Sequence, residues 1–184
     1  MSPQTSNIAN ARVEASGPGA FRIRRFLVAF DGSDQSVCAI NVAGVLAGRL
    51  GAEIVVVTCF STPMLVDPES GYDPNVRAIY ASEAKATLGK AKAILPRSLQ
   101  VETVLREGHP VTEILATAKA HDVDLIIMGT HARGRFAGAL LGSVAHAVAR
   151  RSDIPTMFVT HACAPSSGVE AEPDEQLVSE RGGN

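Results

Sequence analysis

The feature that most constrains the fold is a regular alternation of short apolar runs, rich in Val, Ile and Leu, with longer helical segments. Residues 54–59, for example, read IVVVTC, as expected for a strand that is covered on both faces. The expected strands are residues 26–30, 54–59, 101–105, 125–128 and 154–160. This order predicts an α/β fold with a mostly parallel sheet and helices on both faces.

Local signals mark where the intervening helices begin and end. Ser33 or Asp34 supplies an N-cap for the first helix, and Gly51 follows it as a C′ glycine would. Pro110 suits the first position of the third helix. The expected helices are residues 35–50, 75–95, 111–121 and 143–151. Ligands of such sheets bind outside the carboxyl ends of the strands, where the strand order reverses.

Length and composition indicate one domain with a polar segment at each end. The chain has 184 residues, which is enough for a substantial core without disulfides. Residues 1–20 and 162–184 are polar, small or rich in Pro, Ser, Gly and Glu, so we expect disordered tails around a domain at residues 21–161.

Charge and cysteine usage narrow the classes of function. The formal net charge of −2 argues against a nucleic-acid-binding surface, which needs a clustered basic excess. Cys38, Cys59 and Cys163 lack CxxC spacing, and the first two lie in apolar runs that predict buried thiols rather than a disulfide framework or metal site. No apolar run is long enough to span a membrane, and no secretory signal opens the chain, so we expect a cytoplasmic protein.

The segment from Gly129 to Ser143 carries the strongest functional signal. It leaves a predicted buried strand and enters a helix, and a helix start offers unpaired N–H groups that favour an anion. Gly142 lets a phosphate approach the backbone, and Ser143 adds a hydroxyl donor. Nearby donor side chains are those of His131, Arg133 and Arg135. The alternative interpretation is a glycine-rich turn with solvated arginines.

Asp31 is the second candidate because it directly follows the first predicted strand. A carboxylate at this edge could accept hydrogen bonds from ribose hydroxyls. Asp-Gly is also a common turn pair, so Asp31 and Gly32 are equally compatible with a purely structural turn.

With these segments in hand, the chain resembles the universal stress protein family, from about Arg24 to His161. The resemblance rests on Asp31-Gly32-Ser33, on REGHPVTEIL at residues 106–115, on DLIIMGTH at residues 124–131, on LGSV at residues 141–144 and on IPTMFV at residues 154–159. It implies a UspA-like domain: a Rossmann-like three-layer sandwich whose five-stranded, mostly parallel sheet has strand order 3-2-1-4-5.

The resemblance also implies a nucleotide site. Nucleotide-binding members carry Gly, two residues, Gly, nine residues, Gly, then Ser or Thr. Gly129 and Gly142-Ser143 match at the correct separation, whereas Ala132 replaces the second glycine. If the backbone there needs a positive φ, alanine costs about 1–2 kcal/mol, or roughly tenfold in affinity. The nucleotide-binding residues implied by the resemblance are Ala29, Asp31, Cys59, Met128, Gly129, His131, Ala132, Arg133, Gly142, Ser143 and Val144.

The function implied is that of an ATP-binding sensor or regulator of the stress response, with AMP or ADP as other ligands and Mg²⁺ as a companion of a triphosphate. We find no Walker lysine, paired carboxylates or metal-ligand cluster, which predicts weak or no hydrolysis and no catalytic or metal-binding residues. A homodimer through the last strand, Ile154 to Thr160, is also implied.

Two alternatives stay open. A non-nucleotide-binding, dimeric interaction module of the same family would be compatible with Ala132. The other alternative is an adenylating enzyme. Residues 31–36, DGSDQS, faintly resemble the Ser-Gly-Gly-x-Asp-Ser phosphate loop of such enzymes, although the two leading positions differ.

Overall fold

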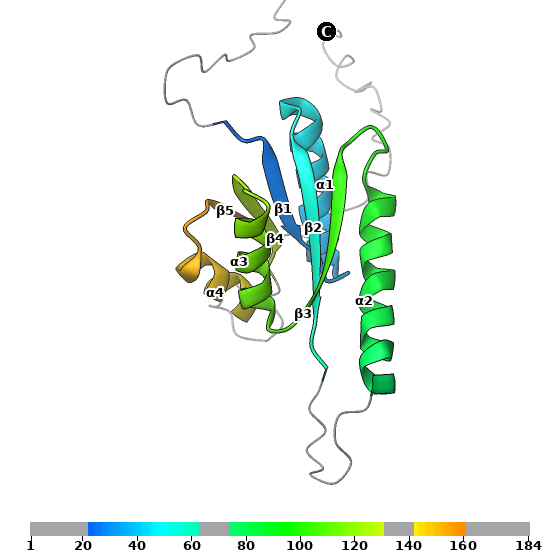
Figure 1. The fold of residues 1–184 in the computed structure, drawn as a ribbon. Coiled ribbons are helices and arrows are strands. Elements are labelled where there is room, and N and C mark those ends of the chain that lie inside the picture. Colours follow the sequence, from blue (N-terminus) through cyan, green and yellow to red (C-terminus); the bar gives the residue numbers. More distant parts are fainter. Residues whose placement is uncertain (1–21, 63–73, 131–141, 161–184) are drawn as a thin grey trace, which may run out of the picture.

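Strands and helices alternate along the chain in the computed structural model, which describes residues 22–62, 74–130 and 142–160 (Figure 1). The elements are β1 (Arg25–Ala29), α1 (Asp34–Leu50), β2 (Glu53–Phe60), α2 (Pro74–Ile94), β3 (Val101–Glu107), α3 (Pro110–Ala120), β4 (Leu125–Gly129), α4 (Ser143–Arg151) and β5 (Thr156–Val159). The predicted tails at residues 1–20 and 162–184 lie outside the described residues.

The five described strands form one sheet in the order β3-β2-β1-β4-β5, and every neighbouring pair is parallel. The α/β fold class and the strand order 3-2-1-4-5 are therefore confirmed. The first strand, β1, lies in the middle of the sheet. Strands β2 and β3 follow on one side of it, and β4 and β5 lie on the other side. Ala29, at the end of β1, is in register with Val57 of β2 and with Met128 of β4. The strand order reverses beside this residue.

Helices cover both faces of the sheet and divide the core into two layers (Figure 1). One layer joins α1 and α2 to side chains such as Val28, Val56 and Ile127, all fully buried. The other joins α3 and α4 to side chains such as Leu27, Val55 and Ile126. Successive side chains on a strand point to opposite faces, so consecutive apolar residues fill both layers. None of the helices in the described ranges is both long and apolar enough to cross a membrane.

The helix ends follow the predicted local signals. Ser33 is the N-cap of α1 and its hydroxyl accepts a hydrogen bond from the Ser36 N–H at 3.2 Å. Gly51 closes α1 in the left-handed region at φ +66°, where its N–H donates to the Ala47 carbonyl. Pro110 occupies the first position of α3. Each signal acts within a few residues, which is why the sequence predicted it.

Strand boundaries depend on pairing, and the prediction for the last strand was too long. The sequence predicted a strand from Ile154 to Thr160, but β5 covers only Thr156–Val159. The Ser152 hydroxyl accepts from the Ile154 N–H at 3.0 Å and donates to the Ile154 carbonyl at 2.8 Å, so a local turn uses these groups. Conversely, β3 extends beyond the predicted Leu105 because its end pairs with the last residues of β2.

Candidate functional site

Asp31 forms a turn that starts α1 immediately after β1. Its Oδ1 accepts from the Ser33 N–H at 3.1 Å and from the Ser33 hydroxyl at 2.6 Å. Gly32 between them has φ +80°, a conformation that favours glycine. Of the two interpretations of Asp31, the turn role is thus present in the structure. The side chain is also exposed at the carboxyl edge of the sheet, where a ligand could reach it.

Gly129 lies at the end of β4, against the first turn of α1. An ideal Cβ on this residue would lie 2.5 Å from the Gln35 carbonyl carbon and 2.7 Å from the Ser36 nitrogen. Real Cβ atoms essentially never approach backbone atoms so closely. Close packing of α1 on β4 therefore explains this glycine without a ligand, which the sequence pattern alone did not indicate.

Four of the predicted site residues converge on the α3 and α4 face of the sheet. Ala29, Cys59, Met128 and Val144 come from β1, β2, β4 and α4, and all four belong to one hydrophobic cluster. Met128 is buried in it, whereas the other three are partly buried at its border. They lie toward the carboxyl ends of the strands or, for Val144, in the first turn of the helix. The structure therefore builds one continuous apolar surface from residues up to 115 positions apart in the sequence.

Cys59 was predicted to be a buried thiol, and the structure places it half-buried near the end of β2. The pKa of the Cys59 thiol is raised to about 11, chiefly by burial and also by the Glu113 carboxylate, while Arg106 acts in the opposite direction. The thiol is therefore protonated at neutral pH. A neutral thiol is a weak nucleophile, so Cys59 contributes a small apolar surface and its backbone groups rather than covalent chemistry.

The N-terminus of α4 lies beside this surface. Gly142 is the N-cap, with φ −63° and ψ 161°, an extended conformation that any residue can adopt. Glycine has no side chain with which to cap the helix, and the first turn of α4 contains no acidic residue. Ser143 is exposed, so its hydroxyl is accessible to solvent. The positive end of the helix dipole here remains uncompensated by a carboxylate of its own first turn.

Three predicted contacts, His131, Ala132 and Arg133, lie outside the described residues. Among the residues that the structure describes, no group of three or more His, Cys, Asp and Glu side chains is arranged to hold a metal ion.

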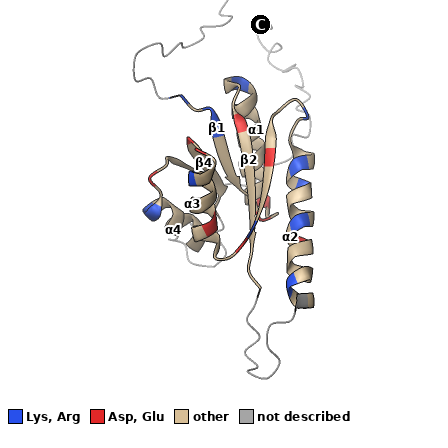
Figure 2. Ribbon diagram, in the orientation of Figure 1, with Lys and Arg blue, Asp and Glu red and all other residues tan. Residues whose placement is uncertain are grey.

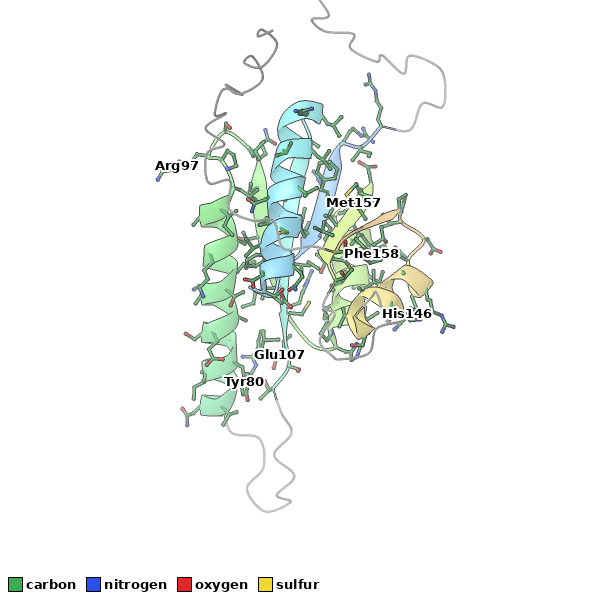
Figure 3. All side chains as sticks on the ribbon, turned by 180° about the vertical axis from the view of Figure 1, so that it is seen from behind. Tyr80, Arg97, Glu107, His146, Met157 and Phe158 are labelled. Atoms are coloured by element: carbon green, nitrogen blue, oxygen red, sulfur yellow. The ribbon has the colours of Figure 1, made fainter. Side chains whose placement is uncertain are left out.

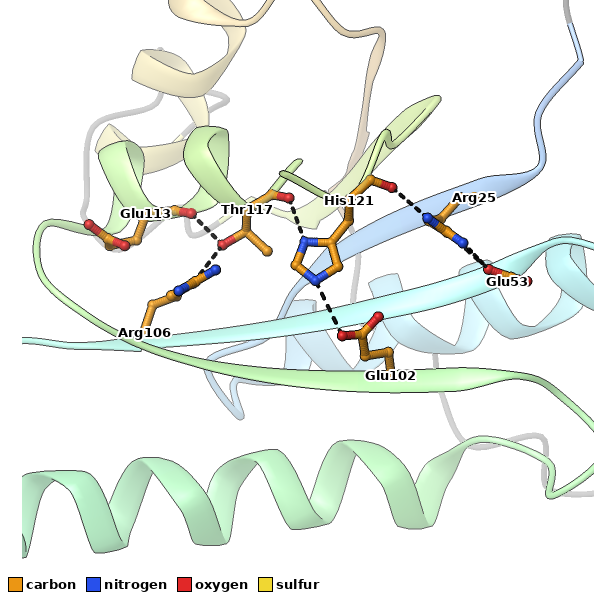
Figure 4. Close-up of polar contacts among 7 residues, drawn as sticks. All are labelled: Arg25, Glu53, Glu102, Arg106, Glu113, Thr117 and His121. Carbon is orange, nitrogen blue, oxygen red and sulfur yellow. Dashed lines mark hydrogen bonds and ion pairs between the residues drawn. The ribbon is translucent and has the colours of Figure 1, made fainter. Parts of the chain in front are cut away.

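The structure adds polar contacts between β3 and α3 that the sequence did not predict. Arg106 of β3 donates through Nε to the Thr117 hydroxyl at 3.2 Å, and that hydroxyl donates to the Glu113 carbonyl at 2.7 Å. Figure 4 shows these contacts joining β3 to α3. His121 follows the last residue of α3, and its ring lies 2.9 Å from the Thr117 carbonyl and 3.2 Å from the Glu102 carboxylate. In the sequence, the only signal for these contacts is that Arg106 and Glu113 lie on either side of the turn between β3 and α3.

A second polar cluster lies on the opposite face of the sheet, under α2. Arg77 of α2 donates through Nε to Glu107 at 2.7 Å, and the Thr62 hydroxyl donates to the same carboxylate at 3.1 Å. The hydrogen bond from Arg77 lowers the pKa of Glu107. Tyr80, one turn further along α2, lies on this side (Figure 3), and basic residues are spread along the same helix (Figure 2). This cluster does not share the face that gathers Ala29 and Cys59.

A protein-family model described as the universal stress protein family matches residues 22–160. A curated relative, the universal stress protein YxiE of Bacillus subtilis, is 34% identical over 145 residues, which cover 73% of this chain and 97% of the relative.

Solved structures are similar over the same region. A protein from the universal stress protein family of Burkholderia pseudomallei is 26% identical, with a TM-score of 0.62, and the alignment covers 78% of this chain and 100% of that one. A universal stress protein solved in complex with cAMP is 27% identical, with a TM-score of 0.53, covering 77% of this chain and 99% of the other.

Proposed function

Since this chain belongs to the universal stress protein family, we propose that it binds an adenine nucleotide, ATP in particular, as a cytoplasmic sensor or regulator of the stress response with weak or no hydrolysis. The proposed site is the carboxyl edge of β1 and β4, on the α3 and α4 face. A universal stress protein 27% identical to this chain has been solved with cAMP, an adenine nucleotide, and this supports the ligand class.

The observation that carries the proposal is the convergence of Ala29, Cys59, Met128 and Val144 on one surface beside the N-terminus of α4. A flat, apolar base would lie on such a surface, with backbone groups at Cys59 meeting its edge. Unpaired N–H groups at Gly142 and Ser143 would face the phosphates, because a helix start favours anions. Asp31 would hold the ribose through its exposed carboxylate, and His131, Ala132 and Arg133 would complete the phosphate loop.

Titration calorimetry of the purified full chain with ATP tests the proposal, with Gly142→Val as the decisive variant. Gly142 has φ −63°, so valine introduces no backbone strain at this position. We expect Gly142→Val to weaken ATP binding about tenfold or more. Gly89→Ala on α2, where nothing lies within 4 Å of the added methyl, should leave the affinity unchanged. Equal affinity of wild type and Gly142→Val, or no binding at millimolar ATP, would contradict the proposal.

The edge strand β5 favours the second candidate function, a dimeric interaction module. In the described sheet β5 pairs with β4 on one side, and the Met157 side chain is 37% exposed. Edge strands with apolar side chains tend to be paired or covered. We propose that two copies meet through Thr156–Val159, with or without nucleotide. Sedimentation of the full chain and of a chain ending at Thr160 tests this: we expect dimers from both, and soluble monomers at all concentrations would refute pairing through β5.

A further inference from the structure

Two oppositely charged side chains, those of Arg106 and Glu113, lie at the carboxyl end of β3 and the turn that follows it. Arg106 is the register partner of Cys59 in the parallel β2–β3 pair, so both side chains point to the α3 and α4 face. The Arg106 Nε donates to Thr117, which holds the guanidinium against α3 (Figure 4). The arginine is thereby fixed next to the position where the base is proposed to meet the backbone of Cys59.

Glu113 lies on the other side of the same turn. Gly108 has φ +146°, and an ideal Cβ on it would lie 2.9 Å from the Glu113 Oε1, so the carboxylate rests directly over the backbone of the β3–α3 turn. The missing side chain at Gly108 leaves room for this position. The charge of Glu113 also acts on the Cys59 thiol, whose pKa it helps to raise. Gly108 in turn donates its N–H to the Phe60 carbonyl at 2.8 Å, so the half-buried Glu113 carboxylate lies over the turn that is bonded to the end of β2.

Neither charge is neutralised by an ion pair within the described part of the chain. The three ion pairs found there involve other residues. Of the Arg106 guanidinium, only Nε donates to Thr117. Among the described residues, no group donates a hydrogen bond to the Glu113 carboxylate, and Thr117 bonds to the Glu113 backbone carbonyl instead. A carboxylate in the first turn of α3 interacts favourably with the helix dipole, but that role would not require it to fold back over Gly108. Thr117 links Arg106 to the Glu113 backbone, and both charged side chains are half-buried, so one ligand could accept from the guanidinium and donate to the carboxylate.

We propose that Glu113 selects adenine, accepting a hydrogen bond from the exocyclic amine while Arg106 donates to a neighbouring ring nitrogen. This inference rests on the proposed nucleotide function and adds base specificity to the same site. Hypoxanthine differs from adenine at this edge: a carbonyl oxygen replaces the amine, and N1 carries a proton. In the proposed pose Glu113 would face that carbonyl and the Arg106 donor would face the N1 proton, so both contacts would turn repulsive and the base with the amine binds more tightly.

The experiment compares ATP with ITP by titration calorimetry on the full chain and on two matched variants. Wild type should prefer ATP about tenfold or more, the loss expected for an unpaired hydrogen bond to a charged group. Glu113→Gln keeps the shape and can donate or accept, so the preference should fall to within about threefold. Glu107→Gln is the matched control. It removes the same charge at the same edge of the sheet, but Glu107 lies on the α2 face and pairs with Arg77, so this variant should keep the preference for ATP.

The outcomes separate this inference from the function on which it rests. Loss of the preference in Glu113→Gln alone, with ATP still bound, supports it. A preference retained in Glu113→Gln overturns it, as does a wild type that binds ATP and ITP equally; in both cases nucleotide binding itself stands. Binding of neither nucleotide by wild type removes the proposed function and this inference with it. Circular dichroism and thermal melts of each variant verify that the fold is intact. If Glu113→Gln is unfolded, Glu113→Asp, which withdraws the carboxylate, should reduce the preference instead, and an unchanged preference in it overturns the inference.

Discussion

Gly129 and Gln35 are packed so closely that no side chain fits between them: an ideal Cβ on Gly129 would lie 2.5 Å from the Gln35 carbonyl carbon. The contact joins the end of β4 to the first turn of α1, the two elements that border the candidate site. It makes Gly129 a structural requirement of this edge, whatever ligand binds beside it.

Gly129→Ala should therefore destabilise the fold, because α1 must move away from β4 to accept the methyl group. We expect a loss of about 2–3 kcal/mol in the free energy of unfolding, in the upper range for overpacking. Urea denaturation followed by circular dichroism measures this. A variant as stable as wild type would show that α1 does not pack on β4 as closely as described.

Gly89→Ala should have the opposite effect. Gly89 is exposed within α2, and nothing lies within 4 Å of an added Cβ. Alanine restricts the unfolded chain and favours a helix, so the free energy of unfolding should rise by about 0.5–1 kcal/mol. The same urea titration applies. A destabilised Gly89→Ala would mean that this face of α2 is covered in solution.

Thr58→Val should destabilise the contact between β2 and Phe30, the residue that links β1 to Asp31. The Thr58 side chain is buried, and its hydroxyl donates to the Phe30 carbonyl at 2.8 Å. Valine has the same shape but no donor, which leaves the carbonyl unsatisfied and costs about 1–2 kcal/mol. Thermal unfolding measures the loss. Thr103→Val, at an exposed position of β3, is the control and should change stability by less than about 0.5 kcal/mol.

The Cys59 thiol should react slowly with iodoacetamide at pH 8, because its pKa is raised to about 11, chiefly by burial. Only the thiolate reacts, so the rate should climb with pH toward that value. Since the folded state holds this proton more tightly than the unfolded chain, Cys59 should lower stability between about pH 9 and 11 and leave it unaffected below. Mass spectrometry of the Cys59 peptide gives the rate, and urea-unfolded protein is the control. A rate that levels off near pH 8.5 in the folded protein would contradict the raised pKa.

Local patterns were sufficient to predict most of the elements. The β-branched run in β2, the Ser33 cap, the Gly51 terminator and Pro110 at the start of α3 all act over a few neighbouring residues, so they can be read without a partner segment. The alternation of these elements, together with the family resemblance, predicted the parallel sheet and its strand order.

Only the tertiary structure decided how the candidate site is built. The reason for glycine at position 129 lies in α1, more than ninety positions earlier, and the extent of β3 depends on its register with β2. Likewise, Arg106 acquires its place beside Cys59 and its contact with Thr117 only when β2, β3 and α3 come together. The sequence by itself determined which segments become strands and helices, because that choice depends on periodicity and nearby hydrogen bonds. Which side chains meet was decided by the packing of distant segments, which no local pattern encodes.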